Sequence, residues 1–184
     1  MTDRKNDRGR RPGRALGMAM LLAGGLALAG CASYSGYTLK AGVATESEVV
    51  ATMGTPAMRW SEPDGSVQLA YPRGPAGTQT FMARLGPDGK LLRIDKVLRP
   101  EYFARIQPGM TQDEVMRLIG PPQPHWTQYF KARDELVWEW LFCDSWNQEA
   151  FFDVLFDGTS KRVRTTMQRQ NMRGWDGVPP GCGP

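Results

Sequence analysis

The sequence has few of the residues on which metal and catalytic sites depend. Its 184 residues include one histidine, His125, and three cysteines, none of which forms a CxxC pair. This composition leaves no convincing zinc site. The chain also lacks a G-x-S-x-G elbow, a phosphate-binding P-loop and a G-x-G-x-x-G dinucleotide fingerprint. We therefore predict neither a metal nor a cofactor.

Catalysis without a cofactor has little support in the residues that remain. Cys143 and His125 could form a nucleophilic dyad oriented by Asp144, although Cys143 could equally belong to a disulfide. Two carboxylate pairs resemble glycosidase acids but are more typical of surface residues at strand ends: Asp144 with Glu149, and Glu135 with Glu139. The sequence therefore predicts a protein that is not an enzyme.

The body of the chain has no excess of either charge. The net charge of +4 comes from residues 1–30, which hold six bases and two acids and leave 17 of each in residues 31–184. A neutral body does not predict a nucleic-acid partner.

The first thirty residues have the layout of a bacterial signal peptide. Basic residues end at Arg14, and the apolar run over 15–27 that follows is shorter than the roughly 20 residues needed to span a bilayer. The run leads to Cys31 through the letters LAGC, which resemble a bacterial lipobox. This resemblance implies cleavage after residue 30, acylation of Cys31 with fatty acids such as palmitate, and a tether over 31–41. The alternative is an ordinary cleaved signal with a coincidental cysteine.

The residue after Cys31 is Ala32 rather than Asp. By resemblance to lipoprotein sorting in Gram-negative bacteria, this implies the outer membrane, with the body facing the periplasm. In that oxidising compartment Cys143 and Cys182 could form a disulfide, which the chain-entropy model values at roughly 4 kcal/mol for a loop of about 40 residues. The alternative is a buried Cys143 and a free Cys182 in a Gly/Pro-rich tail, residues 170–184.

The segment 45–60 repeats at 111–126. Six of the sixteen aligned positions are identical, where average composition predicts roughly one. The identical pairs are Thr45/Thr111, Glu48/Glu114, Val49/Val115, Gly54/Gly120, Pro56/Pro122 and Trp60/Trp126.

Each copy of the repeat predicts a short helix. Thr45 and Thr111 each begin a T-x-x-E capping box. Gly54 and Gly120 are expected to end these helices with a left-handed C-cap. Helices of about nine residues are unstable alone and must lie on another element. A further short helix is expected to begin at Pro100.

The segments that follow each predicted helix alternate like strands of antiparallel sheets covered on one face. The predicted strands are residues 67–71, 80–85 and 91–97 in the first copy and 128–131, 136–141, 151–156 and 161–167 in the second. The sequence therefore predicts an α+β fold of two tandem modules. Each module has one or two short helices on a three- to four-stranded antiparallel sheet.

The second copy resembles a known family. Residues 109–115 read GMTQDEV, 118–122 read LIGPP, and a turn at 156–158 reads FDG. These motifs look like those of the SmpA/OmlA lipoproteins, the family of the outer-membrane assembly factor BamE. The resemblance covers about residues 45–98 and 100–168, which lie in two BamE-like modules, residues 42–98 and 99–169. Their tandem arrangement is also similar to the β-lactamase inhibitor protein architecture.

The resemblance implies a non-catalytic lipoprotein that supports outer-membrane protein assembly or envelope integrity. Its partners would be the outer membrane, reached through the acyl chains, and the β-barrel assembly machinery or another envelope protein. The alternative function is a periplasmic module that binds and inhibits an envelope enzyme. A concave face between the two sheets, lined by Trp138 and Trp140, would favour this alternative.

Two segments are candidates for protein contact. A long Gly/Pro connection follows Tyr71 and carries one charge, Arg73. Aromatic residues cluster at Trp138, Trp140 and Trp146, and exposed aromatics beside Arg are typical contact anchors. The alternatives are a solvated loop and a set of core aromatics.

Overall fold

The structure is a computed structural model that describes residues 35–73, 77–173 and 177–182. All of them belong to one of the two units of the chain, residues 32–184. The expected signal peptide and Cys31 lie outside the described residues.

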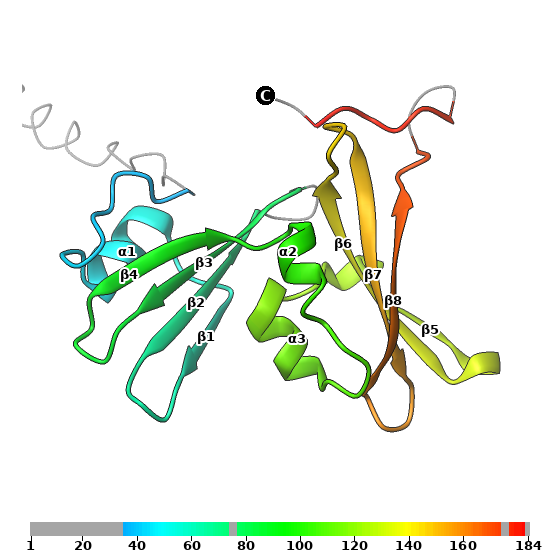
Figure 1. The fold of residues 1–184 in the computed structure, drawn as a ribbon, viewed down its shortest axis with the longest axis horizontal. Helices are drawn as coiled ribbons and strands as arrows, with labels where there is room; N and C mark the ends of the chain where they lie inside the picture. The colour runs from blue at the N-terminus through cyan, green and yellow to red at the C-terminus, as the bar shows by residue number, and fades with distance from the viewer. Residues whose placement is uncertain (1–34, 74–76, 174–176, 183–184) are drawn as a thin grey trace, which may run out of the picture. The chain divides into compact units, whose positions relative to one another are not determined.

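Two four-stranded antiparallel sheets follow one another along the chain, each with its strands in sequential order (Figure 1). The first sheet contains β1 (Met58–Ser61), β2 (Val67–Pro72), β3 (Thr80–Leu85) and β4 (Leu91–Lys96). The second contains β5 (Gln128–Phe130), β6 (Glu135–Cys143), β7 (Glu149–Asp157) and β8 (Val163–Gln170). The predicted α+β fold of two tandem modules is confirmed. β1 is an addition, because its four residues are too few to show an alternating pattern.

Short helices accompany both sheets. They are α1 (Glu46–Met53), α2 (Pro100–Phe103) and α3 (Gln112–Ile119), with 3-10 turns η1 (Pro124–Trp126) and η2 (Lys131–Arg133). Both predicted capping boxes are present, since the N–H of Glu48 donates to the Thr45 hydroxyl at 3.3 Å and that of Glu114 donates to Thr111 at 3.2 Å. No helix among these elements is long and apolar enough to cross a membrane.

The two glycines that end α1 and α3 differ from the prediction. Gly54 and Gly120 have positive φ, 87° and 82°, but their ψ values of −171° and 178° are extended rather than left-handed helical. The chain therefore leaves each helix directly in an extended path. This combination of φ and ψ is essentially restricted to glycine, which explains why both copies carry it.

The same strand connections recur in both modules. A β-bridge joins Thr45 to Lys90 in the first module and Thr111 to Arg162 in the second. Each helix therefore begins against the turn between the last two strands of its own sheet. A register shift interrupts the last strand pair at Leu85 in one module and at Phe156 in the other.

The two faces of the first sheet are both covered. Val49 and Met53 of α1 pack on the side chains of one face, which include Leu69 and Phe81. On the opposite face the core residues are Trp60, Ala70 and Met82. These belong to a second and larger cluster that reaches into the second module.

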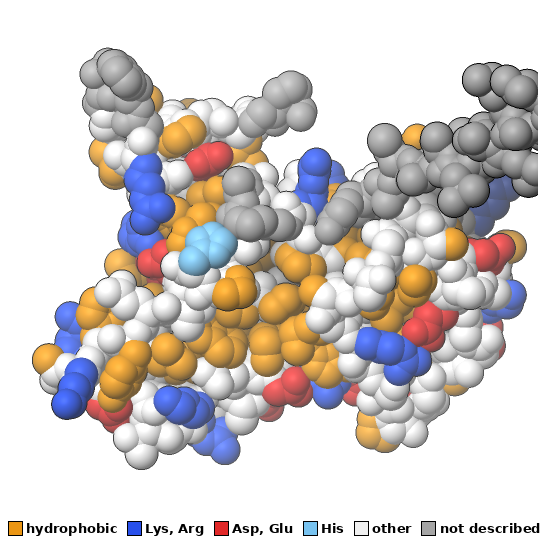
Figure 2. Space-filling model, turned by 180° about the vertical axis from the view of Figure 1, so that it is seen from behind, with side chains coloured by type: hydrophobic (Ala, Val, Ile, Leu, Met, Phe, Trp, Pro, Cys, Tyr) orange, Lys and Arg blue, Asp and Glu red, His pale blue; other side chains and the backbone are white. Residues whose placement is uncertain are grey.

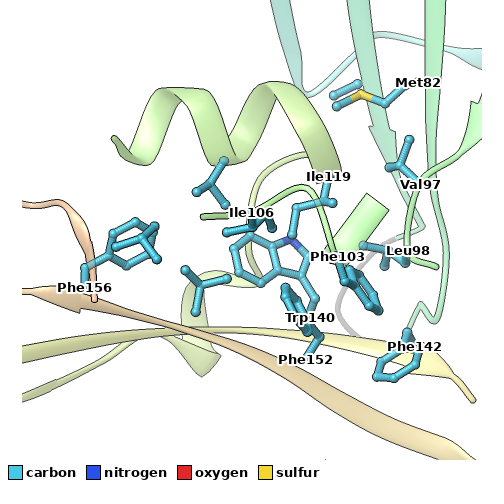
Figure 3. Packing of buried hydrophobic residues seen from close by; sticks show 14 of the residues in the cluster. Met82, Val97, Leu98, Phe103, Ile106, Ile119, Trp140, Phe142, Phe152 and Phe156 are labelled. Atoms are coloured by element: carbon cyan, nitrogen blue, oxygen red, sulfur yellow. The ribbon is translucent and has the colours of Figure 1, made fainter. Parts of the chain in front are cut away.

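This larger cluster places α2 and α3 between the two sheets. Figure 3 shows Trp140 of β6 between the helical residues Phe103 and Ile119 and the strand residue Phe152. The rings of Phe103 and Phe152 stack with their centroids 4.0 Å apart. The two modules therefore share one hydrophobic core.

Polar contacts fix α3 against the first sheet. The indole N–H of Trp60 donates to Asp113 at 2.9 Å, and the Gln68 side chain donates to the carbonyl of Arg117 at 2.6 Å. The guanidinium of Arg117 forms an ion pair with Glu62. These bonds join β1, β2 and the turn after β1 to one helix.

Part of the segment expected as a tether packs on the first module. Gly36 is buried, and a Cβ at this position would lie 2.6 Å from the Ile94 side chain. The N–H of Gly42 donates to the carbonyl of Leu91 at 2.7 Å. Residues 36–42 are therefore held against β4.

A pair of substitutions tests the contact between the modules. Gly54→Ala and Gly120→Ala place a side chain at the same unfavourable φ, but only at Gly120 does the new Cβ meet a neighbour, the Thr80 methyl at 2.7 Å. We expect Gly54→Ala to lower the free energy of unfolding by about 1–3 kcal/mol through backbone strain. Gly120→Ala should lower it by about 1–3 kcal/mol more, because Thr80 is buried and stiff. Urea unfolding measures both values.

The double variant Thr80→Ser, Gly120→Ala is the control, because serine lacks the obstructing methyl group. It should recover most of the difference between the two glycine variants. Equal losses for Gly54→Ala and Gly120→Ala would show that Thr80 does not hold α3 in place.

Candidate protein-binding surface

Two of the five residues predicted to contact a partner are buried. Tyr71 is 1% exposed and Trp140 is 2% exposed, so the prediction is wrong for both. Tyr71 lies under α1, where burial raises the pKa of its hydroxyl to about 12. Trp140 lies between the sheets and donates its indole N–H to the carbonyl of Pro121 at 3.1 Å. Strand alternation assigned these residues to a face but could not show that a helix covers that face.

The other three predicted residues differ in exposure. Trp138 is partly buried, with its ring centroid 4.8 Å from that of Phe156. Arg73 is exposed at the end of β2, and Trp146 is 81% exposed in the turn between β6 and β7. Only Arg73 and Trp146 are therefore fully available to a partner.

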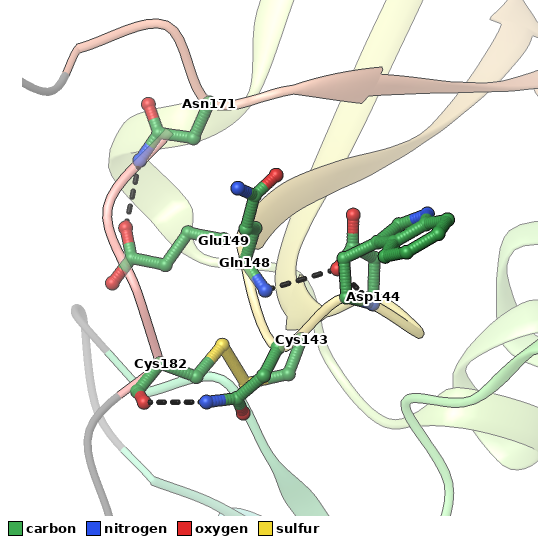
Figure 4. The surroundings of a disulfide bond; sticks show 8 residues. Cys143, Asp144, Gln148, Glu149, Asn171 and Cys182 are labelled. Carbon is green, nitrogen blue, oxygen red and sulfur yellow. Dashed lines mark hydrogen bonds between the residues drawn. A yellow bond between two sulfur atoms is a disulfide. The ribbon is translucent and has the colours of Figure 1, made fainter. Parts of the chain in front are cut away.

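The expected disulfide joins Cys143 to Cys182 (Figure 4). Cys143 thus has no free thiol to pair with His125, and the proposed dyad is overturned. Asp144, its suggested third member, accepts the backbone N–H groups of Trp146 and Gln148 at 2.8 and 2.9 Å. It organises the turn.

The suggested carboxylate pairs are engaged elsewhere. Glu149 accepts a bond from Asn171 at 2.8 Å, Glu135 pairs with Arg133 at 2.8 Å and Glu139 pairs with Arg169 at 2.5 Å. Within the described ranges, no three metal-binding side chains come together.

The face of the second sheet that points away from α2 and α3 is the strongest candidate surface. Strand register places Glu139, Asp153 and Met167 side by side across β6, β7 and β8. The neighbouring row on the same face contains Phe151 and Arg169. We call this surface the outer face.

Aromatic residues are fixed on the outer face by their neighbours. Phe151 is 1% exposed although α2 and α3 cover the opposite face of the sheet. Trp126 of η1 stands on its ring at 90°, with centroids 5.3 Å apart, and the guanidinium of Arg169 lies 4.2 Å from the same ring. His125 lies edge-on to Trp126, and Figure 2 shows the pale-blue histidine beside hydrophobic side chains.

Charged groups lock Arg169 in place. Its Nε donates to Asp153 at 2.8 Å and its Nη2 donates to Glu139 at 2.5 Å. The Asp153 side chain is 4% exposed and its Oδ1 atom accepts no hydrogen bond. Burial raises the pKa of Asp153, and the hydrogen bond and positive charge of Arg169 oppose this shift.

The outer face ends at an open strand edge. β8 pairs only with β7 among the described strands, and it extends over eight residues. Met167 in its middle is 47% exposed. An edge of this length can accept an extended segment of another protein.

Sequence reasoning missed this surface. The sequence repeat relates Trp126 only to Trp60, yet Trp60 is buried against α3 while Trp126 lies on Phe151. The group formed by Glu139, Asp153 and Arg169 depends on the register of three strands. The acidic letters within otherwise apolar β6 and β7 were the available signal.

Comparisons with known proteins leave the family open. No protein-family model and no curated protein match the chain. Among solved structures, the chain is similar to a crystal structure described as the osmotically inducible lipoprotein OsmE, with 27% identity over 40% of this chain and 80% of that one and a TM-score of 0.33. It is also similar to an extracellular SCP-domain protein from Bacillus anthracis str. Ames, with 9% identity over 93% of this chain and 50% of that one and a TM-score of 0.27. Both TM-scores are too low to establish a shared fold, so function is argued from the surface itself.

The burial of Asp153 predicts a particular pH dependence. Because its pKa is raised above the ordinary 3.8 in the folded state, ionisation of Asp153 lowers stability as the pH rises from about 4 through the raised pKa. Asp153→Asn cannot ionise. We expect its free energy of unfolding to rise relative to the wild type over this pH range, as measured by urea unfolding at several pH values.

Asp157→Asn serves as a control with the opposite sign. The N–H of Ser160 and the guanidinium of Arg164 hold the pKa of Asp157 well below its usual range. The ionised Asp157 carboxylate therefore stabilises the fold above about pH 4, and this stabilisation is lost as the pH falls towards the lowered pKa. If the free energy of unfolding of both variants changed with pH in the same direction relative to the wild type, burial would not be the cause of the raised pKa of Asp153.

Proposed function

We propose that this chain is a lipoprotein held at the periplasmic side of the outer membrane by acyl chains on Cys31. It acts there as a non-catalytic scaffold that holds another envelope protein and so supports outer-membrane protein assembly or envelope integrity. The lipobox-like letters before Cys31 support the anchor. The resemblance to the SmpA/OmlA family supports the β-barrel assembly machinery as the partner.

The observation that carries the proposal is the outer face beside the open edge of β8. Arg169 and Trp126 are held in fixed positions by Asp153, Glu139 and Phe151. Fixed arginine and tryptophan side chains lose little entropy on binding and are frequent hot spots. The edge supplies backbone groups for strand addition, and the adjacent side chains supply selectivity.

The alternative function, inhibition of an envelope enzyme, lacks the binding site that it was expected to use. That function required a concave face between the sheets, lined by Trp138 and Trp140. Among the described residues, α2 and α3 occupy the space between the sheets and Trp140 is 2% exposed. We therefore propose the scaffold alone.

Site-specific cross-linking in cells tests the proposal. A photo-reactive amino acid replaces Met167 on β8, and a matched one replaces Leu92 on β4, the edge strand of the other sheet. The two side chains are similarly exposed, 47% and 52%. We expect position 167 to capture a component of the β-barrel assembly machinery, identified by mass spectrometry, and position 92 to capture much less of it.

The same experiment in a Cys31→Ala background asks whether the contact requires the anchor. Loss of the position-167 product is expected, because the unanchored protein is diluted through the periplasm. Equal yields from positions 167 and 92, or capture of proteins unrelated to outer-membrane assembly, would contradict the scaffold.

A further inference from the structure

The turn between β6 and β7 holds a tryptophan rigidly in solvent. Trp146 is 81% exposed, which is unusual for the largest side chain. Asp144 accepts the N–H groups of Trp146 and Gln148, and Asn147 adopts a positive φ of 57°. The backbone that carries the indole ring is therefore fixed.

The C-terminal segment fixes the same turn from the other side. Besides the Cys143–Cys182 disulfide, Asn147 and Cys182 exchange two hydrogen bonds, at 2.9 and 3.1 Å, and the N–H of Glu149 donates to the carbonyl of Pro180 at 2.8 Å. The turn is thus closed by a covalent bond and by hydrogen bonds, while its tryptophan ring remains largely exposed.

Two more exposed apolar side chains lie at this end of the second sheet. Met172 follows β8 and is 61% exposed, and Val178 precedes the disulfide and is 57% exposed. Together with Trp146 they form what we call the apolar tip. An apolar group of this kind, with its aromatic member at the extremity, is typical of proteins that sit in a membrane interface.

The lipid anchor restricts how far the protein can be from the bilayer. Ser35 is the first described residue, four residues after Cys31. A fully extended chain covers at most about 3.6 Å per residue, so Ser35 lies within about 14 Å of an acylated Cys31. Whatever lies beside the first described residues is therefore close to the lipid headgroups.

The first described residues and the Cys143 end of the second sheet are linked through β4 and a shared hollow. Gly36 lies against Ile94 of β4, and Lys96, two residues further along that strand, lines a hollow of about 140 Å³ whose wall includes Cys143. Figure 1 shows the first described segment (blue) beside α1 and β4 of the first module, and the β6–β7 turn at the upper end of the second module. An anchored chain can thus bring Trp146 to the bilayer.

Basic residues surround the same hollow. Lys96 and Arg99 line it and are exposed, and Arg73 is exposed beside it, with its N–H donating to Gln79 of the wall at 3.0 Å. Cations next to an apolar tip suit the phosphate groups of phospholipids, which attract Lys and Arg near a membrane surface.

We infer that the apolar tip is a second membrane contact, which places Trp146 in the phospholipid interface beside the lipid anchor. The inference rests on the proposed acylation of Cys31 but not on the proposed protein partner. Its consequence is a fixed orientation of the scaffold on the membrane, because two contacts prevent the rotation that a single flexible tether allows.

Quenching of tryptophan fluorescence by brominated lipids tests this contact. The full-length protein, shown by mass spectrometry to be acylated, is reconstituted in vesicles of phosphatidylethanolamine and phosphatidylglycerol with brominated acyl chains. We expect quenching in the wild-type protein and loss of most of it in Trp146→Phe. The difference in quenching between the two proteins reports on Trp146 alone. Because this side chain is exposed, we expect the Trp146→Phe variant to fold like the wild type.

A matched control places the reporter elsewhere. Tyr129 is 51% exposed and bonds to Asp134 near the β7–β8 turn, at the opposite end of the second sheet. The double variant Trp146→Phe, Tyr129→Trp should show no recovery of quenching. Equal quenching in wild-type and Trp146→Phe proteins, or full recovery with the tryptophan at position 129, would overturn the inference. A chain found without acyl groups would instead refute the lipid anchor of the proposed function, so the two failures are distinguishable.

Discussion

The position of α3 between the two sheets is the constraint on which the rest of this structure depends. Its apolar side, with Val115 and Ile119, completes the core of the second module and at the same time covers the first sheet. Its polar side is bonded to Trp60 and Gln68. One short helix thus makes the tandem repeat a continuous folded body.

This arrangement determines which surfaces remain for function. With α2 and α3 inside, the aromatic residues that face them are core residues, and any partner must use the outer face, a strand edge or the ends of the sheets. The buried Asp153 is informative here, because a buried carboxylate with an unpartnered oxygen lowers the stability of the fold. Such a residue calls for an explanation other than stability. Under the scaffold proposal, that explanation is that Asp153 holds Arg169 in position.

Local features of the fold were predictable, and long-range ones were not. Thr45 and Thr111 reveal helix starts because each capping box lies within four residues. The fate of Tyr71 and Trp140 was not predictable, because alternation divides a strand into two faces without showing which face another element covers. Trp60 and Trp126 occupy equivalent positions in the repeat, yet one lies between the modules and the other lies on the outer face. The difference arises because α3 follows the first sheet, whereas no described helix follows the second.

The outer face and the apolar tip are joined by β8, and this connection relates the two proposals. Arg169 lies near the end of β8, and Met172 of the apolar tip follows three residues later. An extended strand rises about 3.3 Å per residue, so Arg169 lies roughly 10 Å along the chain from a residue placed at the bilayer. A protein that pairs with the β8 edge would then be held within reach of the lipid headgroups. This geometry suits a partner that is itself embedded in the membrane better than one that diffuses in the periplasm, and it gives the rigid turn around Trp146 a role in setting the height of the binding surface.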